Sequence, residues 1–479
     1  MTSSAASLSR SPTTSVATRV LVNLELVRWH LTASAFWLVV SLLAGLAFAF
    51  QFNNLYPFPG IEWLSPGRVR MVHTNAAAFG FIANAFIAGL LFAIPRLTKR
   101  PILADPLGWV VLGAWNLILV LSAGGQLLGY GQAIEWGETP IFVDPLVVVG
   151  LVLLVVNLAW PILQTREQGL YVSLWYFLAA FAWTGLVYLM GNYLPQFFVP
   201  GVAGAAITGL YIHDLVGLFI TPIGIGLMYF FVPLLLRKPV WSHALSMIGF
   251  WGLAFFYPMQ GVHHFLFSPI PMYAQYGAVV ATIAVEIVVI TVIVNFFATL
   301  HGRADAIRGN LAVRWFFTGM VFYAITCFQC AFQVTLTFQK IIHFTDWVVA
   351  HAHMVMFGVF GFWIMGVAVE LWPRVVGRPW VYPRLLTMHY WMTFIGLSVM
   401  IVDLTAAGLV QGFSWAGLSH WGESVVASMP FWWVRTVAGL IIITGQGCFL
   451  YAAWATARGP ARVVVAAPLV TPVGVAARV

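Results

Sequence analysis

Residues 343–362 read HFTDWVVAHAHMVMFGVFGF, a mostly apolar run that contains a His-x-His pair at His351 and His353. An α-helix needs about 20 apolar residues to cross the hydrocarbon core of a bilayer. The run and the residues after it predict such a helix over residues 346–372. Ionisable side chains inside a membrane helix cost free energy, so the two histidines are candidates for a functional site.

The rest of the chain has the same apolar character. Of its 479 residues, 61% are hydrophobic and 8% are charged, whereas about 25% of the residues of a soluble protein are charged. This composition excludes a soluble enzyme and a disordered chain, and the long apolar runs exclude a barrel of alternating strands. We predict an all-α polytopic membrane protein with twelve transmembrane helices. The expected spans are residues 31–51, 72–95, 107–128, 145–164, 171–193, 203–235, 244–266, 273–300, 313–338, 346–372, 383–410 and 431–456.

The positive charges predict how the chain is oriented. Of the 22 Lys and Arg residues, 18 fall on one set of alternate connecting segments, and the other four are Arg68, Arg70, Lys340 and Arg435. The positive-inside rule then places both termini in the cytoplasm. The net charge of +8 therefore reflects topology, and nucleic acid is not an expected partner. The expected partner of the spans is the lipid bilayer.

The segments between the spans are short, so they leave no room for a second soluble domain. We expect one catalytic domain over residues 29–456. It would lie between an N-terminal cytoplasmic tail over residues 1–28 and a C-terminal cytoplasmic tail over residues 457–479.

Several of the twelve histidines lie in the expected spans. His263 and His264 are adjacent near the end of the seventh span, and neighbours on a helix point about 100° apart. Both can reach one metal ion only if the helix is locally unwound, which Gly261 permits. His213, in the sixth span, is then the natural third ligand. Three histidines with an open position describe a catalytic metal site.

His351 and His353 are two residues apart, so they point to opposite sides of their helix, about 200° apart. They cannot bind one metal ion, but they can serve two flat cofactors, one on each side of the helix. Iron porphyrins held by axial histidines fit this arrangement. One of the two would need a second histidine from another helix, and His73, at the start of the second span, is available.

These histidines resemble those of a known family, the heme–copper oxygen reductases. The closest resemblance is to subunit I of its C family, the cbb-type cytochrome c oxidases. It covers residues 65–456 and rests on the order His, His-His and His-x-His in successive spans. The segments that carry it are GRVRMVHTNAAAFGF (67–81), LYIHDLVGLF (210–219), FFYPMQGVHHFLF (255–267) and the run at 343–362.

The resemblance implies that His213, His263 and His264 bind the active-site copper. In the family, the active-site tyrosine lies six residues before the histidine pair and is joined covalently to the copper ligand of the sixth span. Tyr257 matches this position. Cleaving dioxygen without releasing peroxide takes four electrons at once, of which a ferrous heme can give two and cuprous copper one. A nearby phenol can give the fourth electron together with a proton.

The resemblance also implies two hemes, both expected to be b-type. His73 and His353 would be the axial ligands of the low-spin heme. His351 would be the proximal ligand of the high-spin heme. Arg68 and Arg70 fall where the family places partners of the heme propionates.

Protons must reach the active site from the cytoplasm. Ser246 lies 11 residues before Tyr257, three helical turns, and so on the same face of the seventh span. Tyr229 lies near the cytoplasmic end of the sixth span, and the family's proton path runs along similar positions. Glu286, in the middle of the eighth span, is a further candidate. The family also holds a calcium ion near the propionates through a glutamate of the loop after the third span, where Glu135 lies.

The chain departs from the C family at three positions. Gln329 stands where the family has a glutamate, and Gly249 stands where a histidine is more usual. Glu286 has no obvious partner, and nitric oxide reductases have a glutamate in this span in a similar local context. The alternative function is therefore a nitric oxide reductase, which joins two NO into nitrous oxide and would carry non-heme iron in place of copper.

No C-x-x-C-H motif is present, so no heme is attached covalently to this chain. Electrons must then arrive from a partner subunit, which we expect to carry a c-type heme. We expect a respiratory terminal oxidase of a bacterial or archaeal cytoplasmic (inner) membrane. It would reduce dioxygen to water with electrons from cytochrome c and translocate protons. A proton-coupled transporter is a remote alternative, since no repeat relates the two halves of the chain.

Overall fold

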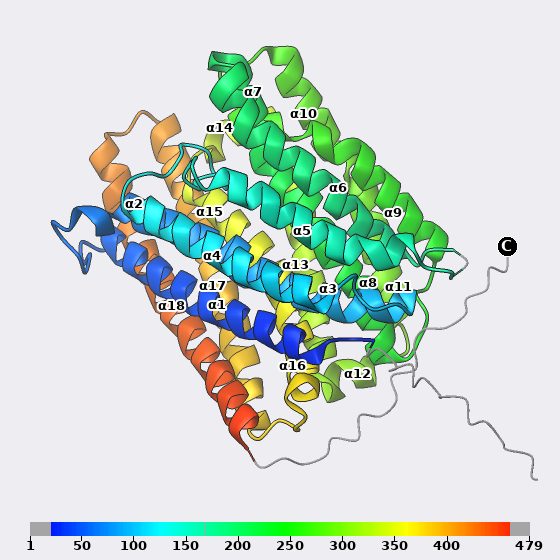
Figure 1. The fold of residues 1–479 in the computed structure, drawn as a ribbon. Helices are drawn as coiled ribbons and strands as arrows, with labels where there is room; N and C mark the ends of the chain where they lie inside the picture. Colours follow the sequence, from blue (N-terminus) through cyan, green and yellow to red (C-terminus); the bar gives the residue numbers. More distant parts are fainter. Residues whose placement is uncertain (1–20, 168, 460–479) are drawn as a thin grey trace, which may run out of the picture.

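The computed structural model describes residues 21–167 and 169–459, and regular structure within them is helical throughout (Figure 1). Eleven helical stretches in these residues are long and apolar enough to cross a membrane. The all-α polytopic membrane fold is therefore confirmed. The tails expected over residues 1–28 and 457–479 lie outside the described residues except at their inner edges.

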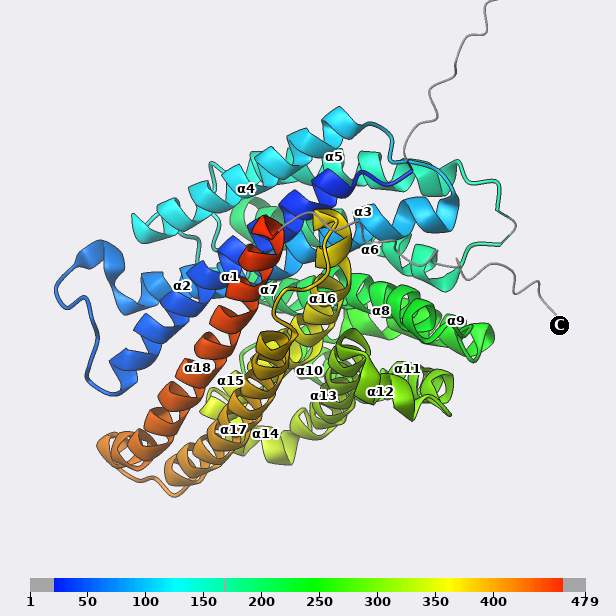
Figure 2. The same cartoon turned by 90° about the horizontal axis from the view of Figure 1, so that it is seen from below.

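Most predicted spans correspond to one continuous helix. These are α1 (Leu24–Phe52), α4 (Asp105–Leu127), α5 (Asp144–Leu163), α6 (Val172–Tyr193), α13 (Leu311–Gln333), α17 (Pro383–Ala416) and α18 (Trp421–Arg458). α17 and α18 form a long hairpin, and α18 also packs against α1 (Figure 2). The helices α12 (Ala304–Gly309) and α14 (Leu336–Ile342) are short and lie in connections.

Four spans consist of two consecutive helices. They are α2 with α3 (Pro66–Asn75, Ala83–Thr98), α7 with α8 (Gly201–Leu215, Thr221–Leu236), α10 with α11 (Met272–Ala284, Glu286–Leu300) and α15 with α16 (Asp346–His353, Phe362–Val376). In three of them a π-helical segment joins the two helices: η2 (Ala76–Ile82), η4 (Val216–Ile220) and η7 (Met354–Gly361). Each π segment begins within three residues of one of the predicted ligand histidines. Such segments occur frequently at functional sites.

The three spans with π segments form the centre of the molecule. In their most apolar windows 89%, 94% and 83% of the residues are buried, against 28% in α1. A helix that is apolar all round and buried all round belongs to the inside of a bundle. The histidines on these three spans therefore lie in the interior, away from lipid.

The seventh predicted span, 244–266, is shorter as a helix than expected. α9 (His243–Phe256) is followed by two 3₁₀ turns, η5 (Tyr257–Met259) and η6 (Gly261–Phe265). Pro258 follows the first residue after α9, and a proline lacks the N–H that would continue the helix. The span therefore unwinds where its tyrosine and two histidines lie.

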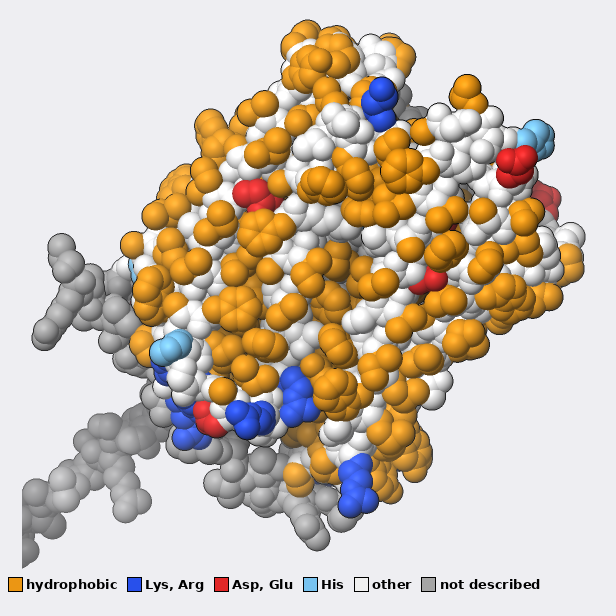
Figure 3. Space-filling view, turned by 180° about the vertical axis from the view of Figure 1, so that it is seen from behind, with side chains coloured by type: hydrophobic (Ala, Val, Ile, Leu, Met, Phe, Trp, Pro, Cys, Tyr) orange, Lys and Arg blue, Asp and Glu red, His pale blue; other side chains and the backbone are white. Residues whose placement is uncertain are grey.

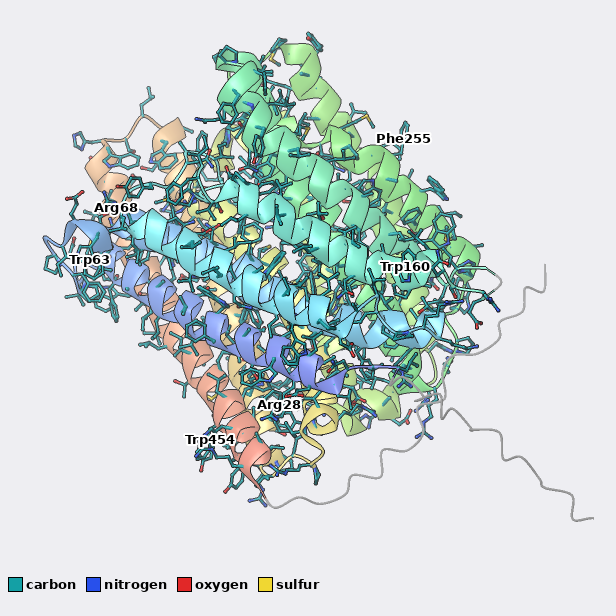
Figure 4. The ribbon with its side chains drawn as sticks, in the orientation of Figure 1. Arg28, Trp63, Arg68, Trp160, Phe255 and Trp454 are labelled. Carbon is teal, nitrogen blue, oxygen red and sulfur yellow. The ribbon has the colours of Figure 1, made fainter. Side chains whose placement is uncertain are left out.

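Hydrophobic side chains cover most of the surface seen in Figure 3, and Lys and Arg gather towards its lower edge. Arg28 on α1 and Trp454 on α18 lie towards one end of the bundle. Trp63, just before α2, and Arg68, on α2, lie at the other end (Figure 4). Tryptophan and arginine at the ends of an apolar band are typical of a protein anchored at two membrane–water interfaces.

Candidate metal and redox centre

The imidazoles of His213, His263 and His264 meet between α7 and η6. One ring nitrogen from each lies within 4.8 Å of the others. His213 Nδ1 is 3.3 Å from His264 Nε2, and the ring centroids of His213 and His263 are 4.4 Å apart. The three side chains that the sequence singled out are therefore brought together.

The unwinding expected at Gly261 is present and explains how two adjacent residues face one point. A Cβ on Gly261 would lie 2.3 Å from the Cα of Leu210, so the η6 backbone rests directly on α7. No other residue type fits this contact without moving the backbone. The close approach brings the histidine pair alongside His213.

A hydrogen bond fixes the tautomer of one of these rings. His263 Nδ1 lies 2.7 Å from Thr282 Oγ1, whose own hydroxyl donates to the carbonyl of Ala278. The Thr282 oxygen therefore accepts from His263 Nδ1–H, and the lone pair of Nε2 is left for a metal ion. Three imidazole nitrogens without a carboxylate form a donor set that fits copper.

Tyr257 packs flat against the first of these histidines. Its ring is 4.6 Å from that of His213, with 16° between the planes. Gly217, one turn after His213 on the same face, makes this possible, since a Cβ there would lie 1.5 Å from Tyr257 Cε1. Gln260 Oε1 lies 3.0 Å from His213 Nε2 on the η5–η6 side.

His73 on α2 and His353 on α15 face each other. Their ring centroids are 6.3 Å apart, with 27° between the planes. Each Nδ1–H donates to a backbone carbonyl, of Ser41 at 2.7 Å and of Val349 at 2.8 Å. Each Nε2 lone pair is thus left for a metal ion. Two metal–nitrogen bonds of about 2 Å and two ring radii of about 1 Å span about the observed distance, so the pair fits an iron porphyrin.

His351 turns to the other side of α15, towards α13. Gln329 Oε1 lies 2.9 Å from His351 Nδ1 and accepts its proton in a hydrogen bond. Cys330 Sγ lies 3.4 Å from Nε2. The residue that departs from the family pattern therefore sets the tautomer of this histidine and leaves the Nε2 lone pair for a metal ion.

The two predicted propionate partners are engaged elsewhere. Arg68 donates to the carbonyl of Leu127 and to Glu62, each at 3.0 Å. Arg70 lies 3.5 Å from Glu135, and both side chains are nearly half exposed. Glu135, the predicted calcium ligand, thus lies in an exposed ion pair.

The buried carboxylate of this loop is Glu138, which is 4% exposed. Its Oε2 accepts from Asn75 Nδ2 at 2.9 Å, and Asn75 lies two residues after His73. Burial raises the pKa of Glu138 above its ordinary value. A buried carboxylate beside a histidine-bearing helix is a stronger candidate for a cation ligand than the exposed Glu135.

Arg435 is a buried cation. From the sequence it was counted only as one of the four Lys and Arg residues on the side opposite the cytoplasm. It is 9% exposed on α18 and stacks over the ring of Phe52 at 4.8 Å. It interacts electrostatically with both His73 and His353. A single arginine inside the predicted span 431–456 was the signal available in the sequence.

The predicted proton-path residues lie in the interior but do not form one hydrogen-bonded chain. Tyr229 is 2% exposed and its hydroxyl accepts from Asn295 Nδ2 at 3.4 Å. Ser246 Oγ donates to its own helix, to the carbonyl of His243 at 2.6 Å. Both carboxylate oxygens of Glu286 are buried and lack a hydrogen-bond partner.

The family described as cytochrome c and quinol oxidase polypeptide I matches residues 25–441. The chain belongs to this family. One relative, a cytochrome c oxidase subunit 1 homolog of Agrobacterium tumefaciens, is 29% identical over 447 residues, which cover 89% of this chain and 82% of the relative. The cbb3-type cytochrome c oxidase subunit CcoN1 of Stutzerimonas stutzeri is 27% identical over 457 residues, which cover 92% and 96%.

A solved heme–copper terminal oxidase shares the fold, with a TM-score of 0.73 at 14% identity over 91% of this chain and 85% of that one. A nitric oxide reductase chain of Stutzerimonas stutzeri matches at 28% identity over 136 residues, 26% of this chain and 28% of the relative. The expected heme–copper oxidoreductase of the cytochrome c oxidase type is confirmed. It is a multi-pass membrane protein of a bacterial oxidase family that uses heme and copper.

Proposed function

We propose that this oxidase chain is the catalytic subunit that reduces dioxygen to water in a respiratory membrane, with electrons from cytochrome c and coupled proton translocation. We choose dioxygen as the substrate because the Tyr257 ring stacks on His213, one of the three clustered histidines. A phenol at this point can deliver one electron and one proton together. A nitric oxide reductase has no need of this fourth electron.

In this proposal His213, His263 and His264 hold copper, and His351 holds the iron of a high-spin heme. His73 and His353 hold the iron of a low-spin heme, and both hemes are b-type. The metals, when bound, supply electrons to the substrate. The chain's own residues orient the ligand nitrogens, exclude water with apolar packing, and bring protons to the site.

Two sites on the outer side belong to the same proposal. We assign the propionates of the hemes to Arg435 in addition to Arg68 and Arg70, because Arg435 is the buried one of the three and interacts with the facing histidines. Glu138, together with or in place of Glu135, would hold a calcium ion near them. An oxygen-rich site of this kind suits a hard cation.

The donor of electrons is proposed to be a partner subunit with a c-type heme. The chain has no C-x-x-C-H motif of its own. The distribution of Lys and Arg supports cytoplasmic termini. Protons would then enter near Tyr229 and Ser246 and leave the path at Tyr257.

Nitric oxide reduction is the second candidate, and Glu286 is the observation that favours it. Its carboxylate is buried without a partner at the break between α10 and α11. A carboxylate in the membrane interior defaults to a functional role, and it could serve a non-heme iron. The neutral Gln329 beside His351 also departs from the oxidase pattern.

The test is turnover of the purified complex with a reduced donor, dioxygen and nitric oxide being offered separately, with metal analysis of the same sample. Rapid dioxygen consumption with one copper per chain supports the proposal. Rapid nitric oxide consumption, slow dioxygen consumption and a third iron would overturn it.

The ligand assignments are tested by visible spectra of two variants. His351→Ala should lose the high-spin heme and keep the low-spin heme, and His73→Ala should do the reverse. His389→Ala is the matched control, since His389 is a fully buried histidine that bonds Gln446 on the α17–α18 hairpin. It should keep both hemes.

A further inference from the structure

The two ring nitrogens of His213 have different partners. Nδ1 lies 3.3 Å from His264 Nε2. Two ligand nitrogens that each lie about 2 Å from one tetrahedral ion are about 3.3 Å apart, so Nδ1 faces the place of the ion. Nε2 lies on another edge of the ring, where Gln260 Oε1 is 3.0 Å away. The side chain of Gln260 therefore contacts the nitrogen that does not bind the metal.

This arrangement fixes the tautomer of His213. A ring nitrogen that binds a metal ion carries no proton, so the proton of the neutral imidazole is on Nε2. Of the two polar atoms of the Gln260 amide, only the oxygen can accept that proton. The amide nitrogen is then a buried donor without a partner among the described residues. Turning the amide over would set two N–H donors against each other, so the oxygen stays on His213.

The backbone of Gln260 joins it to two further residues of the site. Gln260 is 2% exposed and lies between the turns η5 and η6. Its N–H donates to the carbonyl of Tyr257 at 3.2 Å, and its carbonyl accepts from the N–H of His263 at 3.0 Å. The position of the amide oxygen is therefore set by the same turns that place the tyrosine and the histidine pair.

The hydrogen bond to Gln260 and a covalent link between Tyr257 and His213 Nε2 exclude each other. The Tyr257 ring stacks on the face of His213, whereas Nε2–H points in the ring plane towards Gln260. Such a link would replace the Nε2–H and one C–H of the phenol ring by a carbon–nitrogen bond. The two protons and two electrons released would reduce dioxygen to hydrogen peroxide. The hydrogen bond thus belongs to the chain before any such link forms.

We propose that Gln260 is a positioning residue for copper loading. It holds His213 as the Nε2–H tautomer, with the Nδ1 lone pair directed at the ion, until the metal has bound. Without this acceptor the ring is free to carry its proton on Nδ1 or to turn over, and the lone pair is then lost to the metal. This inference rests on the proposed function, which places copper here, and specifies how the chain prepares the site.

The experiment measures the affinity for copper of the intact complex isolated from copper-starved cells. Cuprous ions are competed against a chelator of known affinity. Gln260→Met keeps the length of the side chain and removes the acceptor, and it should weaken copper binding by about 10–100-fold. Gln260→Glu keeps an acceptor oxygen and should bind copper at least as tightly as the unmodified complex. Heme spectra should stay unchanged in both variants.

Gln446→Met is the matched control. Gln446 is 1% exposed, and its Oε1 lies 3.1 Å from His389 Nε2 on the α17–α18 hairpin, so the same kind of buried pair is broken away from the cluster. Its copper affinity should equal that of the unmodified complex. If Gln260→Met does not assemble, Gln260→Asn takes its place, since its amide is one methylene too short to reach His213.

Three results would overturn the proposal. One is a copper affinity of Gln260→Met equal to that of Gln446→Met. Another is a Gln260→Glu complex that binds copper as weakly as Gln260→Met, because the loss would then follow from any change at this position. The third is a Tyr257–His213 link found by peptide mass spectrometry before copper is supplied, since Nε2 would then have no proton to donate.

Failure of the proposed function is distinguishable from failure of this inference. It would appear in the metal analysis of the unmodified complex, as iron in place of copper at the three histidines. The same competition is then run with ferrous iron, because the Nε2–H tautomer prepares His213 for either ion. The same order of affinities among the variants is expected there.

Discussion

Gly217→Ala is the sharpest test of the active-site geometry. Gly217 lies one turn after His213, at the start of the π segment η4. The Tyr257 ring occupies the space that any side chain on Gly217 would need. Adding a single methyl group there therefore acts on the position of the tyrosine and leaves every metal ligand in place.

The structure sets the size of the displacement. The new Cβ would lie 1.5 Å from Tyr257 Cε1, whereas ordinary contact begins at 3.4 Å, so the ring must retreat by about 2 Å. Misplacing a reacting group by about 1 Å can cost about 100-fold in rate. We expect Gly217→Ala to lower dioxygen turnover by about 100-fold or more. Overpacking itself should cost about 1–3 kcal/mol of stability.

The assay measures dioxygen consumption with excess reduced donor, together with heme spectra, copper content and peptide mass spectrometry. The spectra and copper content should match those of the unmodified complex. If Tyr257 and His213 are joined covalently, the cross-linked peptide pair should disappear in the variant. Gly226→Ala is the control, because its Cβ would meet the Phe177 ring at 2.5 Å, on the same span but away from the cluster.

Turnover of Gly217→Ala at or near that of Gly226→Ala, with both metals present, would refute the reasoning. The stacked Tyr257 would then be a packing residue. Loss of copper in Gly217→Ala would indicate instead that His213 is disturbed. In that case added copper should restore turnover, whereas displacement of Tyr257 alone would leave turnover low.

Four further outcomes follow from the hydrogen bonds and charges. Gln329→Leu should weaken retention of the heme proposed to bind His351 by about 10–100-fold on dilution, because the Nδ1 proton loses its nearer acceptor and keeps only Thr326 Oγ1 at 3.3 Å. Gln329→Glu should instead lower that heme's reduction potential in a redox titration, since an anionic acceptor favours the oxidised iron. Arg435→Leu should lower the low-spin potential, because a buried positive charge favours the reduced state. Since burial raises the pKa of Glu138, its contribution to stability is present at low pH and is lost as pH rises through the raised pKa. The Tm of Glu138→Gln should therefore vary less with pH than that of the unmodified chain above pH 4.5, the ordinary pKa of a glutamate. Added calcium should raise the Tm of the unmodified chain only.

The sequence is informative wherever a single residue is expensive to place in a membrane. Apolar runs of the right length predicted the spans, and the histidines within them predicted which spans carry the candidate ligands. The seventh span was predicted as an apolar stretch of the usual length with local unwinding at Gly261, and the earlier end of its helix at Phe256 was not predicted. Its short helix and two 3₁₀ turns depend on Pro258 and on how closely Gly261 seats against α7.

The chain by itself therefore determined the membrane fold and the identity of the candidate ligands, because hydropathy and the cost of buried imidazole are local properties of the sequence. Only the tertiary structure decided which arginine is buried, which loop carboxylate is shielded, and which side chain holds the second ring nitrogen of His213. Arg435, Glu138 and Gln260 come from segments far apart in the chain, and each matters through neighbours on other helices. Burial and hydrogen-bond satisfaction are properties of packing, so no spacing within one segment can reveal them.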